Sequence, residues 1–246
     1  MIRRGIMFGK GQEIDPGNPV AVWLCGLAAA SNDLFVAIKN LDRLDKAGQP
    51  MDKNSGYYQV NKAERSYYFR LGSAHAHEAL SYVSLKFKED NFLTKESSQK
   101  AIKKFIASLS KSARSKRKKL LSYCSSPQSF QELYLAQIRH VTFHYIPNTI
   151  QKAIKERIKD QGGVTEVVIP KSGALIDTRY IFADEVMIEA MKIKIQNKHD
   201  DLNRKTIGLS LKMRKNWRNF VINKVGNIQT LLLVFVGECV KKHTGI

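Results

Sequence analysis

The sequence predicts a mainly α-helical fold, a helical bundle with a small β-hairpin insertion near residues 164–182. Apolar residues recur at three-, four- and seven-residue steps through long segments, as expected for amphipathic helices. One segment alone, VTEVVIP (164–170), has the β-branched composition of a strand. No Pro/Gly/Ser-rich linker divides the 246 residues, of which 43% are hydrophobic. We therefore expect a single domain over residues 1–246, with the hairpin as an insertion at 162–182.

Three helices are expected in the first half of the chain. The first begins near Asn18–Pro19, with proline in the first turn, and ends near Lys46. The second spans about 61–88 and the third about 96–122. The third contains KSARSKRKK (111–119), a run of basic residues with no acid. This run is either a solvated helix face or a phosphate-contacting surface.

The second half begins with a helix whose start is marked by a capping box, formed by Ser129 and Glu132. Pro147 interrupts this helix, because the residue before a proline is pushed away from helical angles. Helix resumes and stops at Gly162–Gly163. The segments 164–170 and 174–182 are expected to form the hairpin, followed by helices over about 183–198 and 207–242.

The charge of the chain favours a polyanionic partner. There are 41 Lys and Arg against 22 Asp and Glu, a net charge of +19. Nucleic acid is the first candidate and an anionic membrane the second, although a basic surface can also have no such partner. The longest apolar run (230–240) covers about 11 residues, short of the roughly 20 that a membrane span needs. We therefore expect no membrane partner.

The three cysteines are widely spaced and form no C-x-x-C pair. This spacing supports neither a zinc ribbon nor a disulfide framework. A reducing, cytoplasmic location fits such a pattern best. No P-loop sequence is present, so a P-loop nucleotide hydrolase is not supported.

The main candidate site lies in QIRHVTFHYIPN (137–148), where Arg139 precedes His144 by five residues. This spacing alone does not identify a site, because Arg70 precedes His75 and His77 at comparable distances. The context of the Arg139 pair distinguishes it. The polar His140 follows the arginine, aromatic residues flank the histidine, and the segment ends at a predicted helix bend.

The stretch RHVTFHY (139–145) resembles the R-(polar)-x3–5-H signature of the HEPN superfamily of α-helical bundles. The resemblance covers about residues 18–160 and the final helix, and YYFRLGSAHAHEAL (67–80) is similar to an early core helix of such proteins. Some members carry a tyrosine two residues after the histidine. Here Ile146 holds that position and Tyr145 directly follows His144, so that subtype is not supported.

The resemblance implies a metal-independent endoribonuclease that cleaves RNA by attack of the 2′-OH, acting as a toxin or phage-defence effector without cofactors. His144 would accept the 2′-OH proton, and Arg139 would clamp the phosphate and stabilise its charge. His140 would position the substrate or protonate the leaving oxygen. The expected partners are RNA, a second copy of the chain and an antitoxin protein. The candidate substrate-binding residues are Tyr145, Arg114, Lys116, Arg117 and Lys118.

Helix geometry constrains the site. Five residues along an ideal α-helix turn through about 140°, so Arg139 and His144 do not share a face. They converge if the helix bends or if a second copy faces the first. Because HEPN ribonucleases pair two protomers to form one cleft, the resemblance implies a homodimer with apposed motif segments.

Other interpretations remain open from the sequence. His144 could make one structural hydrogen bond, Arg139 could pair with Glu132, and Phe143 and Tyr145 could be packing residues. His140 and His144 share a helix face at i and i+4 and could bind a metal, although no third ligand is apparent. The main alternative function is a non-catalytic helical module that binds RNA or protein. A DNA-binding regulator is weaker, since no helix-turn-helix signature is found.

Overall fold

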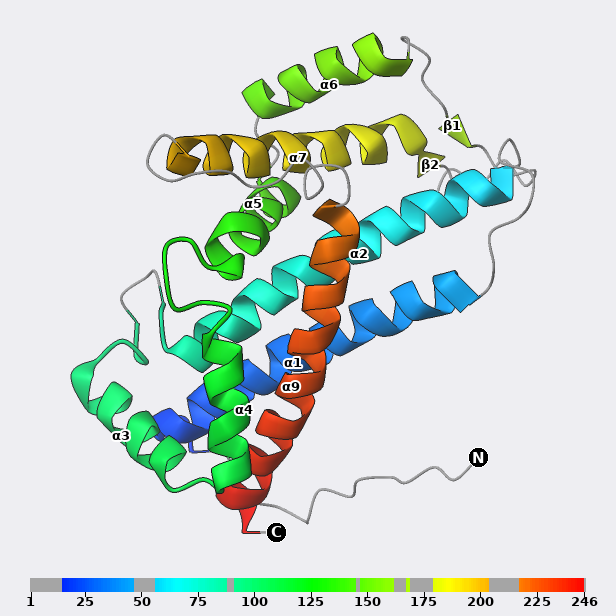
Figure 1. Cartoon of the computed structure of the whole chain (residues 1–246). Coiled ribbons are helices and arrows are strands. Elements are labelled where there is room, and N and C mark those ends of the chain that lie inside the picture. Colours follow the sequence, from blue (N-terminus) through cyan, green and yellow to red (C-terminus); the bar gives the residue numbers. More distant parts are fainter. Residues whose placement is uncertain are drawn as a thin grey trace.

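A computed structural model shows a helical molecule, which confirms the mainly α-helical class (Figure 1). It describes residues 15–46, 56–87, 91–144, 147–161, 167–168, 179–203 and 217–245. The helices are α1 (Pro19–Lys46), α2 (Gly56–Ser84), α3 (Glu96–Ala107), α4 (Lys111–Leu121), the π-helical turn η1 (Gln131–Leu135), α5 (Ala136–Phe143), α6 (Pro147–Gln161), α7 (Ile181–Asn203) and α9 (Trp217–Thr244).

The long helices α1 and α2 lie side by side and antiparallel, and α9 crosses them at an angle. Helices α3 and α4 cover one end of this pair, whereas α5 and α7 pack on the other part of α2 and α6 covers α7 (Figure 1). Trp23 of α1 is fully buried and joins α1 to α2, α3 and α9. Its ring contacts Phe105 of α3 and Phe235 of α9 edge to face. Its Nε1 donates to the Tyr82 carbonyl of α2 at 2.9 Å. Four helices are thus fixed around one side chain.

The start of α1 agrees with the sequence prediction. The Asn18 side-chain oxygen accepts hydrogen bonds from the backbone N–H groups of Val20 and Ala21, at 2.9 and 3.3 Å. An asparagine cap followed by proline therefore begins the helix at Pro19.

The predicted third helix over 96–122 is wrong, because it is two helices. After α3 ends at Ala107 the chain turns through residues 108–110, which buries Leu109. The Ser110 hydroxyl then caps α4 by accepting from the N–H of Ala113 at 3.1 Å. A serine cap can restart a helix without glycine or proline, the residues that usually mark such a break.

Helix α2 also ends earlier than predicted, at Ser84. Leu85 adopts a left-handed backbone with φ of 59°, and the N–H of Lys86 donates to the Ser81 carbonyl at 3.1 Å. This is the hydrogen bond of a Schellman motif, which terminates a helix. Arg117 of α4 completes the end by donating from two nitrogens to the Val83 carbonyl, at 3.2 and 3.0 Å.

The expected β-hairpin insertion over residues 164–182 is not supported. Strands β1 (Val167–Val168) and β2 (Arg179–Tyr180) are antiparallel, with Val167 opposite Tyr180, and each has two residues. Residues 164–166 and 169–178 lie outside the described part of the chain. The returning strand does not reach residue 182, because α7 begins at Ile181.

Two helices, α1 and α9, are long and apolar enough to cross a membrane by length and composition. The uninterrupted apolar runs of the sequence are too short to indicate this property. Within the molecule these helices supply core residues such as Leu27, Leu34, Ile228 and Phe235, which are at most 1% exposed. Helices in the core of a bundle share this composition.

Candidate functional site

The motif segment forms the end of a helix that changes its winding. The chain enters through the π-helical turn η1 and continues as α5 to Phe143. At His144 the backbone becomes extended, with φ of −125° and ψ of 97°, while its N–H still donates to the His140 carbonyl at 2.9 Å. A new helix starts at Pro147. The predicted break before this proline is therefore present, and π-helical turns of this kind are frequent at functional sites.

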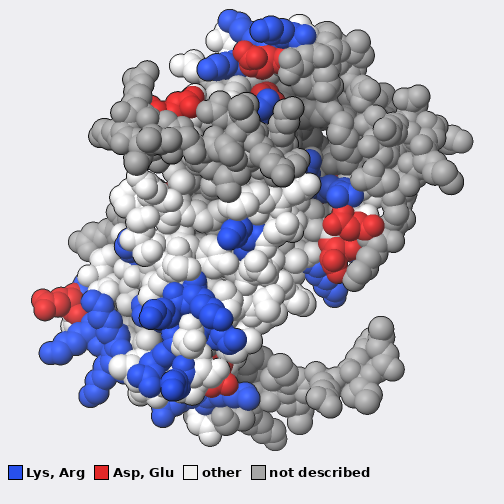
Figure 2. All heavy atoms as spheres, viewed as in Figure 1, with Lys and Arg blue, Asp and Glu red and all other residues white. Residues whose placement is uncertain are grey.

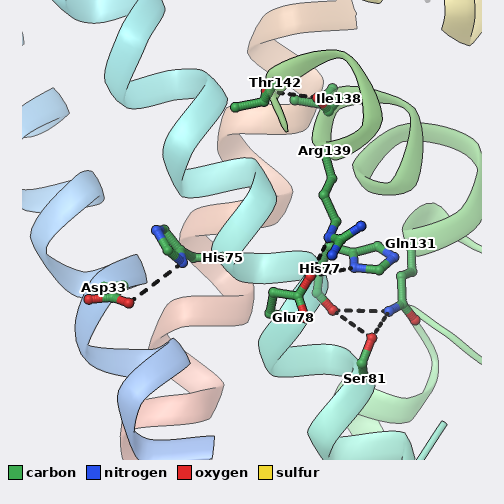
Figure 3. Close-up of polar contacts among 9 residues, drawn as sticks. All are labelled: Asp33, His75, His77, Glu78, Ser81, Gln131, Ile138, Arg139 and Thr142. Atoms are coloured by element: carbon green, nitrogen blue, oxygen red, sulfur yellow. Dashed lines mark hydrogen bonds and ion pairs between the residues drawn. The ribbon is translucent and has the colours of Figure 1, made fainter. Parts of the chain in front are cut away.

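Arg139 points from α5 toward α2, where its Nε donates to the carboxylate of Glu78 (Figure 3). The guanidinium also lies over the Phe143 ring, 5.9 Å from the ring centroid. One third of the Arg139 side chain is exposed, at 33%. The sequence suggested Glu132 as a partner, but the structure pairs Arg139 with an acid 61 residues away along the chain.

Glu78 belongs to a polar cluster on α2. His77, whose side chain is only 7% exposed, places its Nδ1 3.7 Å from a Glu78 oxygen, too far for a hydrogen bond. The buried Gln131 of η1 donates to the His77 carbonyl and to the Ser81 hydroxyl, both at 3.1 Å (Figure 3). Gln131 thereby fixes η1, and with it the start of α5, against the turn of α2 that carries Glu78.

The charges of this cluster stabilise the carboxylate. The interaction with His77, and then the charge and hydrogen bond of Arg139, lower the pKa of Glu78 to about 2, although burial opposes the shift. Glu78 is therefore ionised at neutral pH. Its negative charge offsets the positive charge of Arg139, and its contact with Nε occupies one edge of the guanidinium. A phosphate would therefore have to bind at the other nitrogens of Arg139.

His140 and His144 lie together on the outer side of this helix end. Their ring centroids are 5.1 Å apart and both residues are exposed. The contacts described for Arg139 go to Glu78 and Phe143, whereas those described for His144 go to His140. The i and i+4 spacing therefore places the two histidines together, but within one chain the bend gives no described contact between Arg139 and His144.

The other candidate residues differ in their surroundings. Arg114 and Lys118 are exposed on α4 and Lys116 is half-buried, whereas Arg117 is held on the Val83 carbonyl and its pKa is lowered by burial. Tyr145 lies outside the described residues. Of the four candidate basic residues on α4, Arg117 thus has a structural role at the end of α2, and its binding of substrate stays a prediction.

Sequence reasoning missed Glu78, His77 and Gln131 as parts of this site. The segment containing the first two resembles an early core helix of HEPN proteins, and a pairing across 61 residues has no local signature. Among the described residues, no group of three His, Cys, Asp or Glu side chains could hold a metal ion. Comparison of the chain with protein-family models, curated proteins and solved structures found no significant match.

Proposed function

We propose that the chain is a metal-independent endoribonuclease of the HEPN type, with Arg139, His140 and His144 as its catalytic residues. The observation that carries the proposal is the exposed pair of imidazoles at the broken end of α5, one residue from a guanidinium. Imidazoles exchange protons near neutral pH, and a guanidinium binds phosphate through paired N–H groups. A cytoplasmic toxin or phage-defence effector, with an antitoxin partner, is the setting that this activity would have.

In the proposed reaction His144 accepts the proton of an RNA 2′-OH while the 2′ oxygen attacks the adjacent phosphorus. The bond from phosphorus to the 5′ oxygen breaks, and His140 donates a proton to that leaving oxygen. The products are a 2′,3′-cyclic phosphate and a 5′-hydroxyl. Two imidazoles 5.1 Å apart suit a base and an acid that act on opposite sides of one phosphate.

Arg139 would stabilise the charge that develops on the phosphate. Its Nε donates to Glu78, so the N–H groups on the two terminal nitrogens are assigned to the phosphate. Glu78 is then a positioning residue, because it orients the guanidinium through an ion pair. This arrangement binds an anion more weakly than an isolated arginine would, but it holds the donor groups in a fixed direction.

A second protomer would complete the site. Because Arg139 turns toward α2 while His144 stays outside, we propose a homodimer in which Arg139 of one chain acts with His144 of the other. Mixing Arg139→Ala with His144→Ala protein tests this. Half of the randomly formed dimers are mixed and each holds one intact site, so activity should return to about a quarter of the wild-type value. If the residues act within one chain, the mixture stays inactive.

A non-catalytic helical module that binds RNA or protein is the second candidate. The observation that favours it is the pairing of Arg139 with Glu78, which a purely structural arginine would also make. This candidate predicts salt-sensitive binding without cleavage, and little effect of Arg139→Ala on binding.

Incubation of RNA in EDTA with wild-type protein and with His144→Ala separates the two candidates. The ribonuclease cleaves RNA and the variant does not. His75→Ala is the matched control, because His75 follows Arg70 at the same spacing but lies within α2 beside Asp33, at 3.8 Å. Equal RNA integrity with wild type and His144→Ala would contradict the catalytic proposal.

A further inference from the structure

Basic side chains gather on the end of the molecule formed by α3, α4 and the last turns of α9 (Figure 2). We call this set the α3–α4 basic surface. Among the described residues it has ten exposed cations against one exposed acid, Glu96, while Glu238 is half-buried and accepts a hydrogen bond from Ser110 at 3.2 Å. The ten are Lys95, Lys100, Lys103, Lys104, Lys111, Arg114, Lys118, Lys119, Lys241 and Lys242.

The surface is ordered by its helices. On α4, Lys111, Arg114 and Lys118 follow at steps of three and four residues and share one exposed face. They span seven residues, or about 10 Å of helix. One strand of B-form DNA advances about 3.4 Å along its axis per phosphate, and A-form RNA spaces its phosphates at least as closely, so this row covers at least three phosphates. Ala113 and Leu120, on the opposite face, are buried and hold α4 against the core.

The basic row on α4 offers charge without a platform for bases, because α4 carries no aromatic residue. The nearby rings include those of Phe105 and His243, which contact each other at 6.2 Å, and Phe105 also packs on Trp23. Phe92, which is 37% exposed, precedes α3 and is not on α4. Proteins that bind single strands stack bases on exposed aromatic side chains. Double-stranded RNA is bound mainly through its phosphates and 2′-hydroxyls. We propose that the α3–α4 basic surface binds the backbone of double-stranded RNA, as a docking surface separate from the Arg139 site.

This inference rests on the proposed function for its choice of RNA, and it adds the substrate class: a folded RNA with a stem. Helix α2 relates the two regions, since Arg117 of α4 binds the Val83 carbonyl and Arg139 binds Glu78. These two residues of α2 are five positions, or about 8 Å, apart along its axis. A stem held on α4 would therefore lie at the same end of α2 as the Arg139 site.

The test measures binding in the His144→Ala background, where RNA is not consumed. The probe is an RNA duplex of about 20 base pairs, long enough to cover a domain of this size. The triple variant Lys111→Gln, Arg114→Gln, Lys118→Gln should bind it at least tenfold more weakly, and should reduce the slope of log K against log salt by about three. The matched control is Lys152→Gln, Lys155→Gln, Lys159→Gln, three exposed lysines at the same spacing on α6, which should leave both values near those of the parent.

Three outcomes would overturn the inference. Equal weakening by both triple variants would show that net charge, and not this surface, controls binding. A single strand of uridines bound as tightly as the duplex, with the same loss in the α4 variant, would remove the preference for a stem. Preferential binding to vesicles containing phosphatidylserine would make the surface a membrane contact. This test measures binding and not cleavage, so its result is independent of the ribonuclease assay. A chain that binds stems but never cuts RNA would contradict the proposed ribonuclease activity and still support the docking surface.

Discussion

Replacing Glu78 by glutamine should destabilise the folded protein by about 1–2 kcal/mol at neutral pH. His77 and Arg139 lower the pKa of Glu78 from 4.5 to about 2. At about 1.36 kcal/mol per pH unit, this corresponds to roughly 3 kcal/mol of stabilisation. Because 36% of the Glu78 side chain is exposed, solvent screening reduces the expected value to about 1–2 kcal/mol.

The stabilisation by Glu78 should depend on pH in a defined direction. Its pKa is lower in the folded than in the unfolded protein, so the contribution is complete above the unfolded pKa near 4.5 and is lost as the pH falls through about 2. The difference in unfolding free energy between wild type and Glu78→Gln should therefore shrink by about half between pH 7 and pH 3.

Guanidinium unfolding of both proteins at pH 7 and pH 3 measures this difference. Asp45→Asn is the control, because Asp45 pairs with Arg65 at 2.6 Å but its side chain is 51% exposed. An exposed pair should change stability by less than about 0.5 kcal/mol. Equal destabilisation by the two variants, or a Glu78→Gln difference that is unchanged at pH 3, would refute the reasoning.

Three further predictions concern the elements that carry the site, each measured by urea unfolding. Ser110→Ala removes the cap of α4 and should cost about 1 kcal/mol; Ser110→Asn, which can also cap, should recover most of it, and no recovery would argue against the cap. Gln131→Leu leaves the His77 carbonyl without its donor from η1 and should cost about 1–3 kcal/mol, whereas a neutral effect would remove Gln131 as the link to α2. Ile138→Ala opens a cavity at a fully buried position of α5 and should cost about 2–5 kcal/mol; a loss under about 1 kcal/mol would mean that α5 is not packed as described.

Local signals in the sequence predicted the elements that depend on local chemistry. Asn18 and Pro19 fix the start of α1, and the Ser129 hydroxyl accepts from the N–H of Glu132 at 3.4 Å, which is half of the predicted capping box. Pro147 marks the start of α6. The break between α3 and α4 was missed because serine is common on helix surfaces, and only the tertiary burial of Leu109 shows where the chain turns.

The candidate site could be predicted only in part, because its polar partners come from distant segments. The motif predicts Arg139, His140 and His144 near one helix end, and α5 ends at Phe143. Its spacing could not show that Arg139 turns to Glu78, since that direction follows from the packing of α5 on α2. The same holds for Arg117, which sits in a basic run but caps the end of α2.

Product analysis after RNA digestion in EDTA tests the central claim most directly. Wild-type protein should yield fragments with 2′,3′-cyclic phosphate and 5′-hydroxyl ends, as attack by the 2′-OH requires. His144→Ala should leave the RNA intact, and His75→Ala should cut like wild type. Intact RNA with wild-type protein, or the same fragments with His144→Ala, would contradict the assignment of Arg139, His140 and His144 as a ribonuclease site.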